Sequence, residues 1–166
     1  ELETHITTLL SEMVSIPSVN PGEGTVDNIR GEERMASYLF NYFKHHSYSF
    51  NVKKEEILTD RPNIYIETSN DPNKKTLLFE THTDTVSVDH MSISPFEPFI
   101  KDGKFYGRGS CDAKGQLVAM ISGIEMALEE NDGVLPINVK LAATVDEEHL
   151  HRGVDRLVEL GIKADG

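Results

Sequence analysis

The chain has 166 residues, of which 16 are Lys or Arg and 28 are Asp or Glu, so its formal charge is −12 with histidine neutral. Its apolar content of 38% is enough for one domain with a core, which argues against wholesale disorder. Scattered, outnumbered cations argue against a nucleic-acid partner, and no apolar stretch approaches the roughly 20 residues that span a bilayer.

The single cysteine, Cys111, rules out an internal disulfide framework and predicts a reducing, cytoplasmic compartment. The chain opens on Glu1 without a charged-then-apolar signal segment, so we expect a trimmed N-terminus and no membrane partner. Residues 161–166 form a turn-like stretch after a helical pattern, as if a strand should follow.

Two helices are expected in the first third of the chain. Apolar residues at helical spacing predict a helix over 6–16, ended by a proline. A second helical stripe covers 36–43 and ends near His46, and the polar loop around Gly24 and Asp27 is a plausible start for that helix.

Strands follow where the apolar period changes to two. Paired strands are expected around 50–52 and 64–66, with 60–62 as the turn between them. The short apolar run 76–80 suits a strand covered on both faces, and 137–145 suits another buried strand.

Pro95, Pro98 and Asp102-Gly103 mark an irregular segment, and a short hairpin is expected at 103–107. The clearest amphipathic helix covers 117–128, and a final helix is expected around 154–158. Strands alternating with helices on this rhythm predict an α/β domain of three layers, with a mixed, largely parallel central sheet between helices.

His82 and Asp84 directly follow the apolar run at 76–80. Residues two apart in a strand point to the same side, so an imidazole and a carboxylate would lie next to each other. This is the arrangement of a metal-ligating histidine whose second ring nitrogen is held by a carboxylate. The pattern alone is weak, because about 0.5 His-x-Asp sequences are expected by chance at this composition, and a solvated strand end is the alternative.

Glu147 and Glu148 form one of four adjacent glutamate pairs, and only this pair follows a predicted buried strand. The other three have an ordinary interpretation as solvated charge. Open α/β folds bind ligands at the carboxyl ends of their strands. If the two preceding strands are parallel neighbours, this acidic pair converges with His82 and Asp84 on one crevice.

Asp112 lies in the segment Gly107-Arg-Gly-Ser-Cys-Asp-Ala-Lys-Gly115, at or just before the start of the strongest helix. Glycines allow unusual backbone conformations, and a helix N-terminus favours a carboxylate. A carboxylate fixed there can bridge two cations. A helix-capping aspartate in a glycine-rich turn is the competing interpretation.

Taken together, Thr81-His-Thr-Asp-Thr-Val86, the segment 107–115 and Thr144-Val-Asp-Glu-Glu148 resemble the three N-terminal motifs of the co-catalytic zinc aminoacylases and carboxypeptidases, in order and spacing. This family includes acetylornithine deacetylase, succinyl-diaminopimelate desuccinylase, glutamate carboxypeptidase and aminoacylase. The resemblance covers nearly the whole chain. It implies zinc-dependent hydrolysis of an amide bond in an N-acyl amino acid or short peptide, with cobalt able to replace zinc.

The resemblance also implies a role for each candidate residue. His82 would bind one zinc ion, Glu148 the other, and Asp112 would bridge both. Asp84 would orient the histidine, and Glu147 would be the general base. Two zinc ions acidify a water molecule until a nearby glutamate can deprotonate it at neutral pH.

Further expectations follow from the same resemblance. The peptide bond between Asp112 and Ala113 would be cis. Residues 1–166 would be the N-terminal part of a catalytic domain, with the rest of that domain and an inserted dimerisation and lid domain outside the chain. Each zinc takes one more ligand from those regions, so we expect this fragment to be inactive and the full-length protein to be a homodimer.

Other functions remain open at this point. A dipeptidase or carboxypeptidase is the closest alternative to a deacylase. Phosphate-ester hydrolysis would favour oxygen ligands alone, and His82 argues against it. A non-catalytic or metal-buffering domain is a third interpretation, against which stands Glu147, a residue needed for turnover but not for metal binding.

Three further residues near these motifs have ordinary interpretations. We expect His149 and His151 to face solvent or substrate at the start of a helix. We expect Cys111 to be a small, partly buried thiol without a chemical role.

Overall fold

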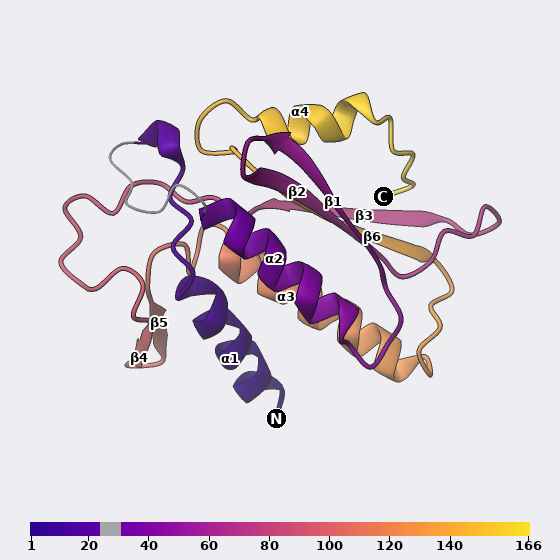
Figure 1. The fold of residues 1–166 in the computed structure, drawn as a ribbon. Helices are drawn as coiled ribbons and strands as arrows, with labels where there is room; N and C mark the ends of the chain where they lie inside the picture. Colours follow the sequence, from indigo (N-terminus) through magenta and orange to yellow (C-terminus); the bar gives the residue numbers. More distant parts are fainter. Residues whose placement is uncertain (24–30) are drawn as a thin grey trace.

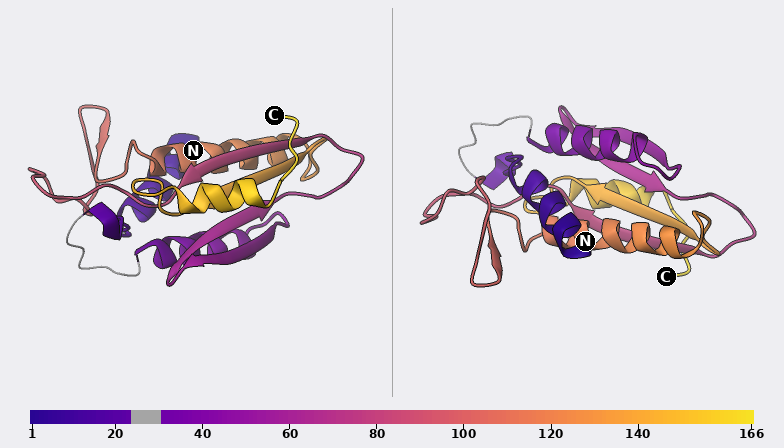
Figure 2. Two further views of the ribbon diagram at one scale, coloured as in Figure 1. Left: turned by 90° about the horizontal axis from the view of Figure 1, so that it is seen from above. Right: turned by 90° about the horizontal axis from the view of Figure 1, so that it is seen from below.

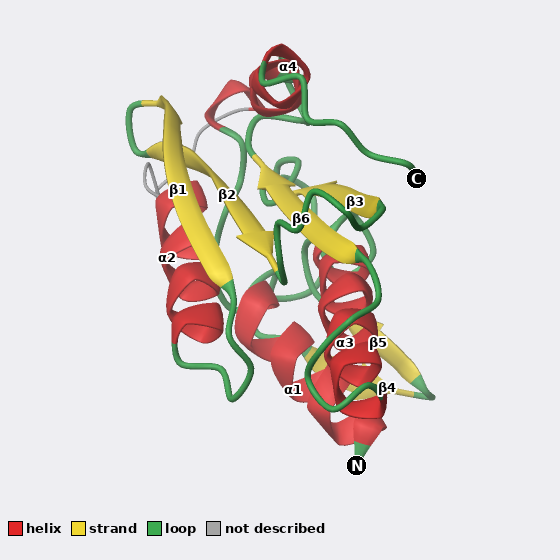
Figure 3. Ribbon diagram, turned by 90° about the vertical axis from the view of Figure 1, so that its right-hand side faces the viewer, coloured by secondary structure: helices red, strands yellow, loops and turns green. Residues whose placement is uncertain are grey.

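The computed structural model describes residues 1–23 and 31–166. A sheet lies between two helical layers, with α1, α2 and α3 on one face and α4 on the other (Figure 1). Figure 3 shows the same layers from the side. The helices are α1 (Leu2–Val14), η1 (Pro21–Glu23), α2 (Gly31–Lys44), α3 (Lys114–Glu130) and α4 (Arg152–Glu159). The strands are β1 (Asn51–Leu58), β2 (Arg61–Glu67), β3 (Thr76–His82), β4 (Phe99–Lys101), β5 (Lys104–Tyr106) and β6 (Asn138–Thr144).

The main sheet has the strand order β1-β2-β6-β3. Strands β3 and β6 are parallel, whereas β1–β2 and β2–β6 are antiparallel. The sheet is therefore mixed, as expected, but the expectation that it is largely parallel is wrong for the described strands. A turn as short as the one between β1 and β2 can join only antiparallel neighbours, because parallel strands need a long crossover.

The turn between β1 and β2 lies earlier than the expected 60–62. Strand β2 already begins at Arg61, and Asp60 takes the left-handed conformation that the tight turn requires, with φ of 59°. Pro62 is the second residue of β2 and lies beside a register shift between Glu56 and Leu58. A proline is tolerated there, because a strand start at an irregular pairing does not need its N–H.

Each expected helical segment overlaps a helix, and α3 and α4 extend a few residues beyond theirs. Helix α1 begins and ends earlier than the expected 6–16, and α2 ends at Lys44 rather than near His46. The expected start of the second helix around Gly24 and Asp27 lies outside the described residues. Among the residues described, no helix has both the length and the apolar character needed to cross a bilayer.

The core lies between the sheet and the three helices on its lower face in Figure 1. Phe43 of α2, Ile64 of β2, Ile121 of α3 and Leu141 of β6 are all almost completely buried. Each lies at an apolar position of the expected pattern, so the faces that the helical and strand periods predicted to be apolar are the faces that point into the core. Burial of these side chains is the main contribution to the stability of the layered fold.

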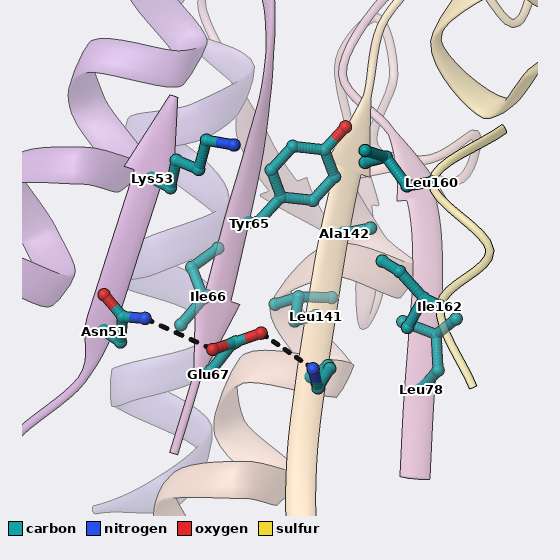
Figure 4. Close-up of a pocket in the computed structure, with 11 residues that line it drawn as sticks. Asn51, Lys53, Tyr65, Ile66, Glu67, Leu78, Leu141, Ala142, Leu160 and Ile162 are labelled. Atoms are coloured by element: carbon teal, nitrogen blue, oxygen red, sulfur yellow. Dashed lines mark hydrogen bonds and ion pairs between the residues drawn. The ribbon is translucent and has the colours of Figure 1, made fainter. Parts of the chain in front are cut away.

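Strand β3 lies at the edge of the described sheet. It is not covered on both faces as expected, because Leu77, Leu78 and Phe79 are only partly buried. On the α4 side, Leu78, Leu160 and Ile162 line a hollow of about 150 Å³ (Figure 4). On the other side, Leu77 and Phe79 line an apolar groove of about 580 Å³ beside α3. The sheet therefore presents apolar surface on both sides of this edge.

The C-terminal residues hydrogen-bond to the outer edge of β3. The Asp165 N–H donates to the Thr76 carbonyl at 2.7 Å, and the Leu78 N–H donates to the Gly166 carbonyl at 2.9 Å. The stretch expected to be turn-like therefore ends alongside β3 and pairs with its edge.

Strands β4 and β5 form a hairpin closed by Asp102 and Gly103, both with positive φ. An Asp-Gly pair favours this type of turn. Both views in Figure 2 show the hairpin standing away from the main sheet and its helices. Phe99 and Tyr106 stack on it, with ring centroids 5.0 Å apart.

We predict that Leu141→Ala lowers the free energy of unfolding by about 2–5 kcal/mol, because it leaves a cavity in the central strand. The matched control is Val158→Ala on the outer face of α4, where the side chain is 74% exposed and the change should be within about 0.5 kcal/mol. Urea unfolding followed by circular dichroism measures both. Equal effects of the two substitutions would contradict the assignment of the core.

Candidate metal centre

The parallel pairing of β3 with β6 brings two strand ends together. His82, the last residue of β3, lies opposite Thr144, the last residue of β6. The pairing continues one step further, because the Thr83 N–H donates to the Thr144 carbonyl at 2.8 Å. The segments that carry Asp84 and the acidic pair Glu147–Glu148 therefore leave the sheet side by side. The expected convergence at the carboxyl ends of the strands is confirmed.

The two ring nitrogens of His82 have different surroundings. Nδ1 lies 2.9 Å from the backbone carbonyl of Asp84 and 3.4 Å from its carboxylate, so the carbonyl is the closer partner. Nε2 lies 3.0 Å from the Asp112 carboxylate and 3.7 Å from that of Glu147. Because the Asp84 segment occupies Nδ1, the nitrogen that faces the other carboxylates is Nε2, and it is the one able to bind a cation.

The Asp84 carboxylate is fully buried and joins the two strand ends. It accepts the backbone N–H groups of Glu147 and Glu148, each at 3.1 Å. Burial opposes ionisation of this carboxyl, but hydrogen bonds from His82, Asn20 and the Glu148 N–H together lower its pKa. Asp84 is therefore a fixed anion behind the histidine.

Within the described part of the chain, one group of three metal-ligand side chains has its donor atoms within 4.8 Å of one another: His82, Glu147 and Glu148. Both glutamates lie close enough to bind a metal ion, so distance alone does not show which would be a ligand and which a general base. Burial, together with the neighbouring charges of Asp112 and Glu147, raises the pKa of Glu148 against the opposing effect of His82.

Asp112 reaches the histidine from a loop before α3. The N-cap of α3 is Ala113 and has no side-chain capping hydrogen bond, so the interpretation of Asp112 as a helix cap is not supported. The Asp112 side chain is instead 72% exposed and faces His82. The peptide bond between Asp112 and Ala113 is cis, as the resemblance implied.

Two glycines give this loop its path. Gly109 has φ of +80°, and a Cβ there would lie 2.8 Å from the Thr85 side chain. A Cβ on Gly115 would lie 2.3 Å from the Ser110 carbonyl oxygen. A larger residue at either position would displace the loop from the end of β3, and Asp112 with it.

Lys114 anchors the start of α3 from within the core. Its ammonium group is completely buried and donates to the carbonyls of Met13 and Ile16, at 3.0 and 2.7 Å. Burial lowers the pKa of this lysine to about 7. The sequence pattern did not single it out, although a lysine so close to a helix start is a visible signal.

The donor set fits a divalent metal ion of the zinc type. It combines one imidazole nitrogen with several carboxylates, which is the mixture that such ions accept in proteins. Burial by itself would lower the pKa of His82, but Asp84 and Asp112 outweigh it and raise that pKa to about 9. The carboxylates thus attract a positive charge to the position where His82 Nε2 lies.

A buried charge network behind the site was not expected from the sequence. Arg61 is 8% exposed, forms an ion pair with Glu32, and donates to Asp146 at 2.8 Å. The Glu32 carboxylate, 3% exposed, also accepts the Asp146 N–H at 3.0 Å. Its interpretation as solvated charge is therefore wrong, because α2 packs this residue against the end of β6.

Asp146 is the centre of that network. Its carboxylate accepts from Asn20 at 3.0 Å, from Arg61 at 2.8 Å, and from Arg152 at 2.5 Å. Burial opposes ionisation, but these donors hold the pKa of Asp146 well below its usual range. Since Asp146 directly precedes Glu147, the network also fixes the turn that carries the acidic pair.

The remaining residues near the site lie at the surface. His151 and His149 are exposed, as expected. The His151 ring lies 3.9 Å from the Glu147 carboxylate, and a Cβ on Gly22 would lie 2.5 Å from the His149 ring. Cys111 is exposed rather than partly buried, because Ala113 is the residue of this loop that turns into the core.

Comparison with known proteins gives one family match by sequence. The model of peptidase family M20/M25/M40 matches residues 78–166. An uncharacterised metallohydrolase of Methanocaldococcus jannaschii is 35% identical over 153 residues, which cover 84% of this chain and 36% of that protein. A succinyl-diaminopimelate desuccinylase of Verminephrobacter eiseniae is 30% identical over 168 residues, covering 95% of this chain and 40% of that protein. The chain therefore spans well under half the length of these relatives.

Solved structures give the same picture of the fold. Human carnosine dipeptidase 1 superposes with a TM-score of 0.79 at 26% identity, covering 96% of this chain and 36% of that one. An M20 family metallo-carboxypeptidase of Sulfolobus solfataricus superposes with a TM-score of 0.69 at 26% identity, with the same coverage.

We predict that Arg61→Met lowers the free energy of unfolding by about 3–5 kcal/mol, because it leaves the buried Glu32 carboxylate without its cation and removes one of the two arginine partners of buried Asp146. The matched control is Arg156→Met, which breaks a surface pair with Glu55 and should cost at most about 1 kcal/mol. Denaturant unfolding of both variants at neutral pH decides the point. A loss for Arg61→Met as small as that for the surface arginine would show that the network contributes little.

Proposed function

Because the chain belongs to peptidase family M20/M25/M40, we propose that it carries the metal-binding part of a hydrolase. The bond cleaved is the amide of an N-acyl amino acid or a short peptide. The observation that carries this proposal is the meeting of His82 Nε2 with the Asp112 carboxylate at 3.0 Å, beside the acidic pair Glu147–Glu148.

In this proposal His82, Asp112 and Glu148 hold the metal, with Asp112 as the ligand shared between two ions. Zinc suits a site of one imidazole and several carboxylates, and cobalt accepts the same ligands. When bound, such ions would polarise the scissile carbonyl and increase the acidity of water. Asp84 would keep the histidine in the tautomer that leaves Nε2 free.

Glu147 is the residue we propose as general base. Its carboxylate is 42% exposed and lies 3.7 Å from His82 Nε2, so it can reach both the site and solvent. It would remove a proton from the attacking water molecule as the new carbon–oxygen bond forms. The same carboxylate would then pass that proton to the amine that leaves when the carbon–nitrogen bond breaks.

Two substrate types are supported by different relatives. The desuccinylase relative favours an N-acyl amino acid, of the succinyl-diaminopimelate or acetylornithine type. The fold likeness to a carnosine dipeptidase favours a dipeptide. Both contain an amide close to a free carboxylate, and we propose the N-acyl amino acid first, because the desuccinylase match covers 95% of this chain. A domain that buffers metal without turnover is a weaker candidate, since it would have no need of Glu147.

We also propose that the described residues are one part of a larger catalytic domain. The apolar surface on both sides of β3 would suit covering elements, and the hydrogen bonds that Asp165 and Gly166 form with its edge involve backbone groups that a further strand could use. A homodimer of the full-length protein and a cytoplasmic location belong to the same proposal. The exposed free thiol of Cys111 favours a reducing compartment.

In the full-length enzyme, we predict that Glu147→Gln lowers turnover by about 10²- to 10⁴-fold, because the general base is lost. Zinc binding should be retained, since Glu147 is not a ligand in this proposal. Release of free amine from an N-acetyl amino acid measures turnover, and metal analysis after dialysis measures zinc. Near-normal rates in the variant would refute Glu147 as the base, and Glu129→Gln on α3 serves as a control that leaves the rate unchanged.

For the 166-residue chain alone, we predict weak zinc binding and no hydrolysis. The proposed ligands give each metal ion only two protein ligands, one of them shared, whereas a catalytic zinc has three. Added zinc should still raise the midpoint of thermal unfolding, and a chelator should reverse the rise, because binding favours the folded state. Tight uptake of two zinc ions, or measurable deacylation, would contradict this ligand assignment.

A further inference from the structure

The side chain of Asn20 lies fully buried between two carboxylates. Its NH₂ group donates to Asp84 at 2.7 Å and to Asp146 at 3.0 Å. Its carbonyl oxygen accepts the Gly22 N–H at 2.8 Å. The opposite amide orientation would place an oxygen against both carboxylates, so the hydrogen-bond partners determine which way the group points.

The two carboxylates that share this NH₂ group belong to different strand ends. Asp84 follows β3 and holds His82, whereas Asp146 follows β6 and precedes the acidic pair Glu147–Glu148. Two buried carboxylates brought together without a donor would repel each other. Asn20 supplies that donor without adding a charge.

The backbone of Asn20 is fixed to the β3 side of the site. The Asn20 N–H donates to the Thr85 carbonyl at 2.8 Å, and the Thr85 N–H donates to the Ser18 carbonyl at 2.9 Å. This short parallel bridge places Asn20 beside the segment that carries Asp84. The side chain then reaches across to Asp146, so one residue connects both halves of the site.

We propose that Asn20 is a positioning residue of the metal centre, because its NH₂ group holds Asp84 and Asp146 together. The spacing between His82 and the acidic pair would depend on that link. The role in metal binding rests on the proposed function, but the link itself does not. It can be measured in the metal-free chain.

Asn138 provides a matched control at the opposite end of the sheet. It is 2% exposed and begins β6, and its carboxamide also bonds both ways, accepting the Asp71 N–H at 2.9 Å and donating to the Asp71 carbonyl at 2.8 Å. None of its contacts involves the candidate metal centre. Loss of this amide should destabilise the fold without moving the site.

The experiment compares Asn20→Leu with Asn138→Leu, two substitutions of similar shape that remove the hydrogen bonds. Asn20→Ser and Asn138→Ser form a second, milder pair for use if a leucine variant does not fold. The first readout is amide hydrogen exchange at Glu147 and Glu148 in metal-free protein. Val145 is the internal reference, because its N–H bonds to the side chain of Asn63 at 3.0 Å. The second readout is titration of the His82 ring signals with zinc chloride by NMR.

If Asn20 positions the site, its substitution speeds exchange at Glu147 and Glu148 by more than at Val145, because their N–H groups donate to Asp84. Zinc affinity falls by about 10- to 100-fold, as for the loss of other residues that orient metal ligands. The Asn138 variants should change the exchange rate by the same factor at Glu147, Glu148 and Val145. They should leave zinc affinity within about threefold of that of the unsubstituted chain, which is well below the effect of losing a residue that orients a ligand.

If the Asn20 variants speed amide exchange at Glu147 and Glu148 by no more than at Val145, the positioning role is overturned, whatever the zinc result. A third outcome is faster exchange at Glu147 and Glu148 in the Asn20 variants, together with no zinc uptake by the unsubstituted chain. That result would support the link that Asn20 makes between Asp84 and Asp146, and it would refute the proposed metal site. Zinc affinity that falls equally in the Asn20 and Asn138 variants would also overturn the proposal, because general destabilisation would then explain it.

Discussion

The arrangement of the candidate site depends on one buried carboxylate, that of Asp84. It lies just after β3 with no solvent exposure and accepts backbone N–H groups from the turn after β6. Such charge-assisted bonds hold the acidic pair Glu147–Glu148 in front of His82. Removing the carboxylate would leave two partly buried N–H donors without their partner, so the fold and the site both depend on this group.

The turn that donates to Asp84 also explains the buried charges behind the site. The turn after β6 contains Asp146, a second fully buried carboxylate, which is held ionised by Arg61 and Arg152. A buried ion pair is weak evidence for stability, since desolvation of both charges offsets their attraction. Its geometric effect is more specific, because the guanidinium of Arg61 connects α2, β2 and the turn at fixed distances. The edge that carries the candidate metal ligands is thereby cross-linked by ion pairs on the side away from solvent.

The sequence predicted the parts of this arrangement that depend on local pattern. Residues at the carboxyl ends of two apolar strands converge, so His82 and the acidic pair could be placed together once β3 and β6 were assumed parallel. Asn20, Glu32 and Arg61 could not be found this way, because their partners are distant in sequence and their residue types are common on surfaces. The partial exposure of β3 was missed for a similar reason, since an apolar run does not show what covers each face.

An anomalous difference map would show whether His82, Asp112 and the neighbouring glutamates form a metal centre. Crystals of the 166-residue chain soaked in millimolar zinc chloride would be measured at the zinc absorption edge. If they form one, a peak is expected about 2.0–2.2 Å from His82 Nε2 and from a carboxylate oxygen of Asp112. Zinc bound only at other imidazoles, such as His5 and His46 beside Glu125, with no peak at His82, would contradict it.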